Sequence, residues 1–100
     1  DIHRTQLPLL SLLQPKVFED VIASLQDMAR TGGDIPRWPL ANVYTGCMIG
    51  SHSFASIAEA LLKNHSGIDA VALYSHMVQQ ATTPRPHGGR DNVQDWISKG

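Results

Sequence analysis

Residues 15–33 read PKVFEDVIASLQDMARTGG and are the strongest structural signal in the chain. A proline suits the first turn of a helix, where its missing N–H group has no helical partner, so Pro15 predicts the start of a helix. Gly32 and Gly33 predict its end. The apolar side chains between them recur at helical spacing, in one row at Val17, Val21, Leu25 and Met28 and beside it at Phe18, Ile22 and Ala29.

A leucine-rich cluster precedes this helix and predicts a short buried helix that starts near Pro8. Its apolar members are Leu9, Leu10, Leu12 and Leu13. Further along the chain, apolar residues at helical spacing within residues 54–62 predict a third helix. Ser56 with Glu59 is a candidate capping box for its N-terminus, although the helix could also begin nearer Ser53.

Two more helices are predicted in the second half of the chain. Asp69 is a good N-cap for the first of them, whose apolar positions are Val71, Tyr74, Met77, Val78 and Ala81. Residues 82–90 contain two prolines and two glycines and predict a loop, in which we expect His87 to be solvated. Asp91 with Gln94 then predicts the beginning of a short last helix that carries Val93, Trp96 and Ile97.

The predicted elements form helix pairs joined by long loops, and no alternation typical of strands is visible. This order predicts an all-α fold with an α/α hairpin architecture such as a toroid, in which long loops gather at one end and carry the site. Roughly 100 residues of short helices with long loops bury little surface by themselves. We therefore expect residues 1–100 to be a fragment of one larger domain.

Composition argues against several classes of function. A net charge of −1 provides neither the basic field that nucleic acid requires nor a polybasic membrane patch. No apolar run approaches the roughly 20 residues that span a bilayer. The single Cys47 excludes a disulfide framework within this sequence, and we expect it to lie in the core with Met48. No His-x-x-x-His pair shares a helical face, which disfavours a zinc site.

Residues 36–50, PRWPLANVYTGCMIG, are too apolar for an ordinary solvated loop and too interrupted for a helix. Pro36 and Pro39 argue against regular strand pairing, so we expect this loop to line a pocket. Trp38 can offer a flat apolar face to a sugar ring, or it can be a core residue. Arg37 can bind an anionic or hydroxyl group, or it can be a solvated charge.

Carboxylates are absent from residues 36–52, so a glycosidase reading requires at least one of its two acidic groups elsewhere. Counting residues leaves a Ser/His/acid triad open, but the G-x-S-x-G pattern that often carries such a serine does not occur. The sequence also lacks a P-loop and a dinucleotide-binding fingerprint.

Six blocks follow one another along nearly the whole chain. They read DIHRTQLPLL at 1–10, QPKV at 14–17, PRWPLA at 36–41, TGCMIGSH at 45–52, IAEALLK at 57–63 and GRD at 89–91. In order and spacing they resemble the blocks of glycoside hydrolase family 92, the calcium-dependent exo-α-mannosidases.

The resemblance implies an (α/α)6-barrel catalytic domain, of which residues 1–100 would be one fragment. It implies inverting hydrolysis of terminal α-mannosyl residues of glycans, with one carboxylic acid, one carboxylate base and a bound calcium that helps to distort the sugar ring. The base and most calcium ligands of the family lie beyond Gly100, so no metal ligand is assigned in this chain. The implied partners are a mannose-containing glycan and the remainder of the catalytic domain, in a secreted, periplasmic or lysosomal setting.

Tyr44 occupies the position of the family's catalytic glutamate, and Leu7 replaces a histidine before Pro8. A tyrosine with a free pKa of about 10 is a poor general acid near neutral pH. Two readings follow from this departure. The chain belongs either to an α-mannosidase-like hydrolase or to a catalytically silent homologue that acts as a sugar-binding or structural component of a larger assembly. A glycosyl phosphate, whose leaving group needs less protonation, is a further candidate substrate.

The resemblance also points to individual site residues. Trp38 and Tyr44 are expected in the pocket, Tyr44 at the acid position. Arg37, Thr45 and His52 are further candidates for substrate binding. Asp1 and Arg4 are expected to form a buried pair behind the pocket.

Overall fold

The computed structural model describes residues 2–86 and 90–100, and over these residues the chain is mostly helical. Its elements, in chain order, are the short 3-10 helix η1 (Ile2–Arg4), α1 (Gln6–Leu13), α2 (Pro15–Gly32), β1 (Pro39–Leu40), β2 (Val43–Tyr44), α3 (His52–Leu62), α4 (Ala70–Thr82) and α5 (Val93–Lys99). Within this part of the chain no helix is both long and apolar enough to cross a membrane. The expectations for Asp1 and His87 lie outside the described residues.

Helix α2 has the predicted ends. Pro15 is its first residue, and Gly33 ends it in the left-handed conformation, with φ at 89° and its N–H donating to the carbonyl of Ala29. Of the two apolar rows named from the sequence, the one with Phe18, Ile22 and Ala29 is the more deeply buried. Phe18 and Ile22 are fully buried, whereas Val17 is 43% exposed. This is because α1, α3 and α4 all pack on the side of α2 that carries Phe18 and Ile22.

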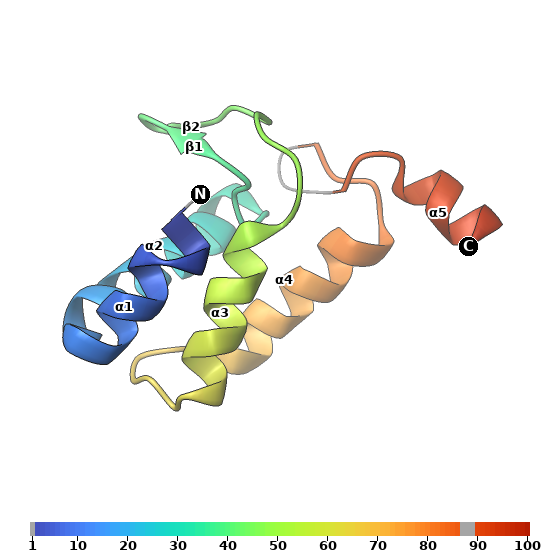
Figure 1. Cartoon of the computed structure of the whole chain (residues 1–100). Coiled ribbons are helices and arrows are strands. Elements are labelled where there is room, and N and C mark those ends of the chain that lie inside the picture. The colour runs from blue at the N-terminus through green and yellow to red at the C-terminus, as the bar shows by residue number, and fades with distance from the viewer. Residues whose placement is uncertain (1, 87–89) are drawn as a thin grey trace.

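Four helices enclose the core. Helices α1, α2 and α3 contact one another, α4 packs against α2 and α3, and α5 touches only the end of this group through α4 (Figure 1). The side chains that make up the core are Leu7, Phe18, Ile22, Ala29, Ile35, Ile57, Ala60 and Leu73. The core therefore draws on every helix from α1 to α4 and on the segment that follows α2.

The expectation that the leucine cluster is buried was wrong. Helix α1 buries Leu7 and Ser11, whereas Leu9, Leu12 and Leu13 are 54%, 70% and 72% exposed. A helix of eight residues turns only one side to its neighbours, and here that side faces α2 and α3. In a cluster that is apolar all round, the sequence did not indicate which side this would be.

The helix starts in the second half were predicted unevenly. Asp69 caps α4 as expected, because its carboxylate accepts a hydrogen bond from the N–H of Ala72 at 3.0 Å. The capping box at Ser56 was wrong, since α3 begins at His52 and Ser56 lies inside it, whereas the alternative start nearer Ser53 is within one residue of the observed one. The last helix begins two residues after Asp91, and the preceding Asn92 adopts the left-handed conformation.

A short hairpin connects α2 to α3, although the prolines argued against any pairing. Strands β1 and β2 are antiparallel, with Pro39 opposite Tyr44 and Leu40 opposite Val43. Pro39 has no N–H to donate, but a two-residue ladder at an edge tolerates this. Ala41 completes the turn with a positive φ of 52°. In Figure 1 the hairpin lies beyond the ends of the helices, next to the N-terminal segment.

Candidate functional site

The base of the hairpin borders a cavity of about 440 Å³ between η1, α2 and the start of α3. We call it the histidine cavity. It is lined by Ile2, His3, Leu7, Val21, Leu25, Arg37, Trp38, Pro39, Met48, His52, Ser53 and Ser56. Arg37, Trp38 and His52 were candidates from the sequence, and the fold brings them together here. Tyr44 and Thr45 do not line this cavity.

Two imidazoles form part of the wall. The rings of His3 and His52 stack with their centroids 4.3 Å apart and their planes 21° from parallel. Desolvation lowers the pKa of His3, and the nearby charges of His52 and Arg4 lower it further. The ring of His3 therefore stays neutral to a lower pH than an ordinary histidine does.

Arg37 holds two loops together at the edge of the cavity. Its guanidinium donates to the carbonyl of Met48 at 2.8 Å and to both carboxylate oxygens of Asp91 at 3.3 Å. The Arg37 side chain is only 9% exposed, whereas that of Asp91 is 71% exposed. The guanidinium thus already has a carboxylate and a carbonyl as partners within the chain.

Trp38 and Thr45 have different roles in the loop. Trp38 borders the cavity and keeps 46% of its surface exposed, so its ring is available to a ligand. The hydroxyl of Thr45 donates to the carbonyl of Trp38 at 2.6 Å and accepts from the N–H of Cys47 at 3.1 Å. Thr45 therefore shapes the backbone that presents Trp38.

Cys47 and Met48 do not belong to the core, contrary to expectation. Cys47 is exposed, and Met48 is 44% exposed with a positive φ of 66°. The segment that carries them runs from the hairpin to the start of α3, outside the group of helices that encloses the core (Figure 1). Arg4, expected in a buried pair, is exposed as well.

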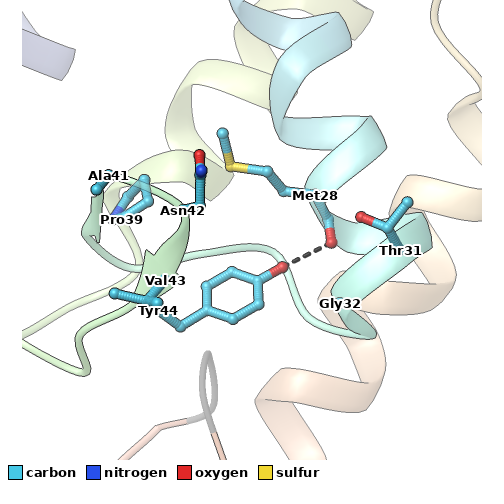
Figure 2. Close-up of a pocket in the computed structure, with 8 residues that line it drawn as sticks. All are labelled: Met28, Thr31, Gly32, Pro39, Ala41, Asn42, Val43 and Tyr44. Atoms are coloured by element: carbon cyan, nitrogen blue, oxygen red, sulfur yellow. Dashed lines mark hydrogen bonds between the residues drawn. The ribbon is translucent and has the colours of Figure 1, made fainter.

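Tyr44 lies on the other side of the hairpin. It lines a second cavity, of about 290 Å³, together with Met28, Thr31, Gly32, Pro39, Ala41, Asn42 and Val43 (Figure 2). Its hydroxyl points to the end of α2, where the carbonyls of Met28 and Asp34 lie 2.6 and 2.7 Å away and accept from it. A side chain at Gly32 would collide with the ring, since a Cβ there would lie 2.8 Å from Tyr44 Cζ.

This environment is unfavourable to acid catalysis by Tyr44. Burial raises the pKa of its hydroxyl, and the negative charge of Asp34 raises it further. A general acid near neutral pH needs the opposite shift. Because its hydroxyl lies between two backbone carbonyls, either of which can accept its single proton, Tyr44 anchors the hairpin to α2.

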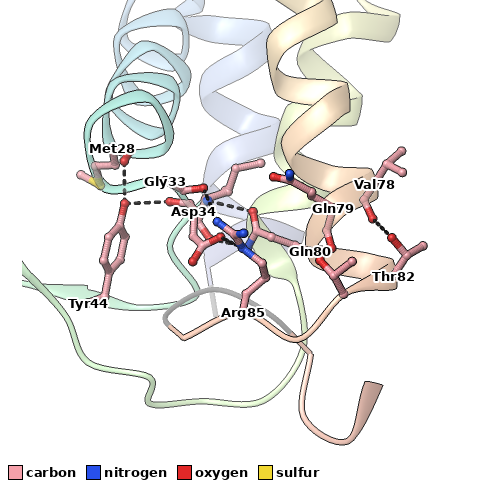
Figure 3. Close-up of polar contacts among 11 residues, drawn as sticks. Met28, Gly33, Asp34, Tyr44, Val78, Gln79, Gln80, Thr82 and Arg85 are labelled. Carbon is pink, nitrogen blue, oxygen red and sulfur yellow. Dashed lines mark hydrogen bonds and ion pairs between the residues drawn. The ribbon is translucent and has the colours of Figure 1, made fainter. Parts of the chain in front are cut away.

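A buried polar network holds in place the segment after α2 to which Tyr44 is hydrogen-bonded (Figure 3). Asp34, which is 1% exposed, accepts a hydrogen bond from Arg85 Nε at 2.6 Å, and Arg85 also donates to the carbonyl of Gly33 at 3.2 Å. The amide of Gln80 accepts from the N–H of Ile35 at 2.8 Å and donates to its carbonyl at 2.9 Å. These contacts join the segment after α2 to α4 and to the loop that follows it.

Helices α1 and α2 and the turn after α3 also assemble a serine, a histidine and a carboxylate. Ser11 Oγ lies 2.9 Å from His65 Nε2, and His65 Nδ1 lies 3.5 Å from Glu19 Oε1. Hydrogen bonds from Ser66, with a smaller effect of His65, lower the pKa of Glu19. Ser11 is only 6% exposed and receives a hydrogen bond from Lys63. We interpret the cluster as a link between helices.

The sequence did not point to the serines of the histidine cavity or to His3 as a lining residue. Ser53 and Ser56 lie on the first two turns of α3 and were considered only as helix caps. A helix start at His52 would have placed both on the cavity side, but no side-chain cap marks that start. Among the described residues, no group of three or more His, Cys, Asp or Glu could hold a metal ion, so no residue here is assigned to calcium.

The stacked histidines predict that the folded state loses stability in acid. Because the pKa of His3 is lowered from the ordinary value of about 6.5, the unfolded chain binds this proton first as pH falls. Protonation of His3 therefore leaves the unfolding free energy unchanged well above pH 6.5 and lowers it increasingly below that pH. In urea denaturation at pH 7.5 and 5.5, the wild type should lose more stability than His3→Phe, which keeps a ring to stack on His52. Equal losses would contradict the assignment.

Comparison with known proteins adds one finding. The sequence matches the family described as the glycosyl hydrolase family 92 catalytic domain, and the match extends over residues 1–100. No curated protein and no solved structure matches the chain.

Proposed function

The chain belongs to glycosyl hydrolase family 92, and on this premise we propose that it is part of a hydrolase acting on terminal α-mannosyl residues of glycans. Within that domain, residues 1–100 supply a wall of the substrate pocket. The helix pairs would form one section of an (α/α)6 toroid, completed by the remainder of the catalytic domain.

The histidine cavity is the observation that carries this proposal. It combines the exposed face of Trp38 with the imidazoles of His3 and His52 and the hydroxyl of Ser56. A flat apolar ring beside hydroxyl and imidazole groups suits a sugar, which presents apolar C–H faces and a rim of hydroxyls. The cavity therefore supports binding of a pyranose at the base of the hairpin.

The reaction needs groups that this wall does not contain. Within residues 2–86 and 90–100 no carboxylate lines the histidine cavity, and Tyr44 is directed away from it with a raised pKa. Inverting hydrolysis requires one carboxylic acid and one carboxylate base on opposite sides of the bond. We propose that both, and the ligands of an assisting calcium, come from residues outside this chain.

The hydrogen-bonded position of Tyr44 also favours an alternative to a hydrolase. If nothing else supplies the acid, the same pocket would belong to a catalytically silent homologue that binds sugar or supports a larger assembly. Turnover separates these two readings, whereas binding alone does not.

The test is hydrolysis of an aryl α-mannoside by the intact protein in the presence of calcium. We expect turnover by the wild type, and turnover by Tyr44→Phe within about twofold of it. The Tyr44→Phe variant should lose about 1 kcal/mol of unfolding free energy, because a hydrogen bond to two partly buried carbonyls disappears. Tyr74→Phe, at a position 65% exposed, is the matched control and should change neither quantity.

The outcomes discriminate between the readings. Mannoside binding without turnover would favour the silent homologue. A loss of turnover of a hundredfold or more in Tyr44→Phe, with its fold intact, would show that Tyr44 takes part in catalysis. Absence of both binding and turnover would refute the α-mannosyl assignment.

A further inference from the structure

Ser56 Oγ and His3 Nδ1 are buried polar atoms of residues that line the histidine cavity. Neither has a hydrogen-bond partner within residues 2–86 and 90–100. Ser56 is only 1% exposed. Buried polar atoms in native proteins nearly always have a partner, and an unsatisfied one costs about 1–3 kcal/mol. Two such atoms in residues that line one cavity indicate that something else satisfies them.

Ser53 provides an internal comparison. It lies three residues before Ser56 on α3 and lines the same cavity, but its hydroxyl donates to the carbonyl of Pro36 at 2.7 Å. Ser53 therefore joins the loop to α3. Ser56 has no such contact within the described chain. Its hydroxyl therefore does not serve to hold the loop around Pro36 against α3.

The charges around the cavity restrict the kind of ligand. Of the lining residues in the described part of the chain, only Arg37 has a permanent charge, and its guanidinium is hydrogen-bonded to Met48 and Asp91. Among the residues that the structure describes, no acidic side chain lines the cavity. A hydroxyl and a neutral imidazole can each donate or accept a hydrogen bond, as can the hydroxyls of a sugar. A phosphate would instead require unengaged cationic donors.

We propose that Ser56 and His3 bind the hydroxyl groups of a neutral sugar ring in the histidine cavity, with Trp38 against the ring. This assignment rests on the proposed function, since it concerns the same pocket. It adds two binding residues and the expectation that the ligand is uncharged. It also disfavours the glycosyl phosphate considered from the sequence.

The test distinguishes a binding role of Ser56 from a structural one by measuring sugar affinity and the ligand-free unfolding temperature of the same variant. In the intact protein, Ser56→Ala should weaken binding of methyl α-mannoside about tenfold, because one buried hydrogen bond to the ligand is lost. The same variant should raise the ligand-free unfolding temperature by about 3 °C, because an unsatisfied buried hydroxyl is replaced by a good helix former. A structural hydroxyl would lower it.

Ser53→Ala is the matched control. It should lower the unfolding temperature, because the carbonyl of Pro36 loses its partner. His3→Phe, which preserves the stacked ring, should weaken mannoside binding by a similar factor to Ser56→Ala. Calorimetric titration measures the affinities, and a parallel titration series uses methyl α-glucoside and inorganic phosphate.

Each result decides between the two proposals. If methyl α-mannoside does not bind but methyl α-glucoside does, and Ser56→Ala weakens it, the present inference stands and the α-mannosyl assignment falls. If Ser56→Ala and His3→Phe bind mannoside as the wild type does, the inference falls and the α-mannosyl assignment stands. Failure of both glycosides to bind, or phosphate binding that depends on Ser56, overturns the inference.

Discussion

Replacing Arg85 with leucine should lower the unfolding free energy by about 3 kcal/mol, because it leaves the carboxylate of Asp34 buried without its cation. Asp34 is 1% exposed and lies 2.6 Å from Arg85 Nε. Loss of one member of a buried pair costs about 3–5 kcal/mol, and the partial exposure of Arg85, 26%, places this pair at the low end. Equilibrium urea denaturation measures the loss.

The chain offers a control with equal geometry and different burial. Arg30 and Asp27 also lie 2.6 Å apart, but their side chains are 74% and 63% exposed. Solvent screening reduces such a pair to at most about 0.5 kcal/mol, so Arg30→Leu should change stability little. Equal losses of unfolding free energy in Arg85→Leu and Arg30→Leu would show that burial of the carboxylate does not set the size of the effect. Adding Asp34→Asn to Arg85→Leu should recover part of the loss, since it removes the unpaired charge.

The effect should extend to the hairpin. The backbone carbonyl of Asp34 is one of the two acceptors of the Tyr44 hydroxyl, so the pair holds in place the segment to which the hairpin is anchored (Figure 3). Weakening that anchor should loosen the loop that presents Trp38. We therefore expect Arg85→Leu to weaken sugar binding although Arg85 does not line the histidine cavity.

Replacing Gln80 with leucine should cost about 3 kcal/mol, because two backbone groups then lose a buried partner. The side-chain amide of Gln80 is 1% exposed and satisfies both the N–H and the carbonyl of Ile35. Each group left unsatisfied costs about 1–3 kcal/mol, and leucine fills a similar volume, so the loss reflects the hydrogen bonds rather than a void.

Hydrogen exchange at the amide of Ile35 gives a local readout of the same change. We expect its protection to fall about a hundredfold in Gln80→Leu, in line with the lost free energy. Gln79→Leu, at the neighbouring exposed position of α4, is the control and should leave both stability and protection nearly unchanged. Unaltered protection of Ile35 in Gln80→Leu would contradict the proposed link between α4 and the end of α2.

Local signals in the sequence predicted the helices well where a cap or a breaker acts within one turn. Pro15 and Gly33 delimit α2, and Asp69 begins α4, because these residues change the backbone energy at their own position. The sequence left the start of α3 open between Ser53 and Ser56, because no side-chain cap marks the observed start at His52. The pairing of Pro39 with Tyr44 was missed because a two-residue ladder depends on the anchor of Tyr44 at α2.

Residue types in the sequence were sufficient to indicate a mostly helical chain, the family and a pocket-lining role for the loop with Trp38. The packing of helices decided which sides became interior, and so buried Phe18 and Ile22 of α2 more deeply than Val17 and exposed most of the leucine cluster. It also placed Tyr44 and Trp38 on different cavities and brought His3 and Ser56 to the same one. The physical reason is that periodicity and capping act within one segment, whereas burial and hydrogen-bond partners depend on residues distant in sequence.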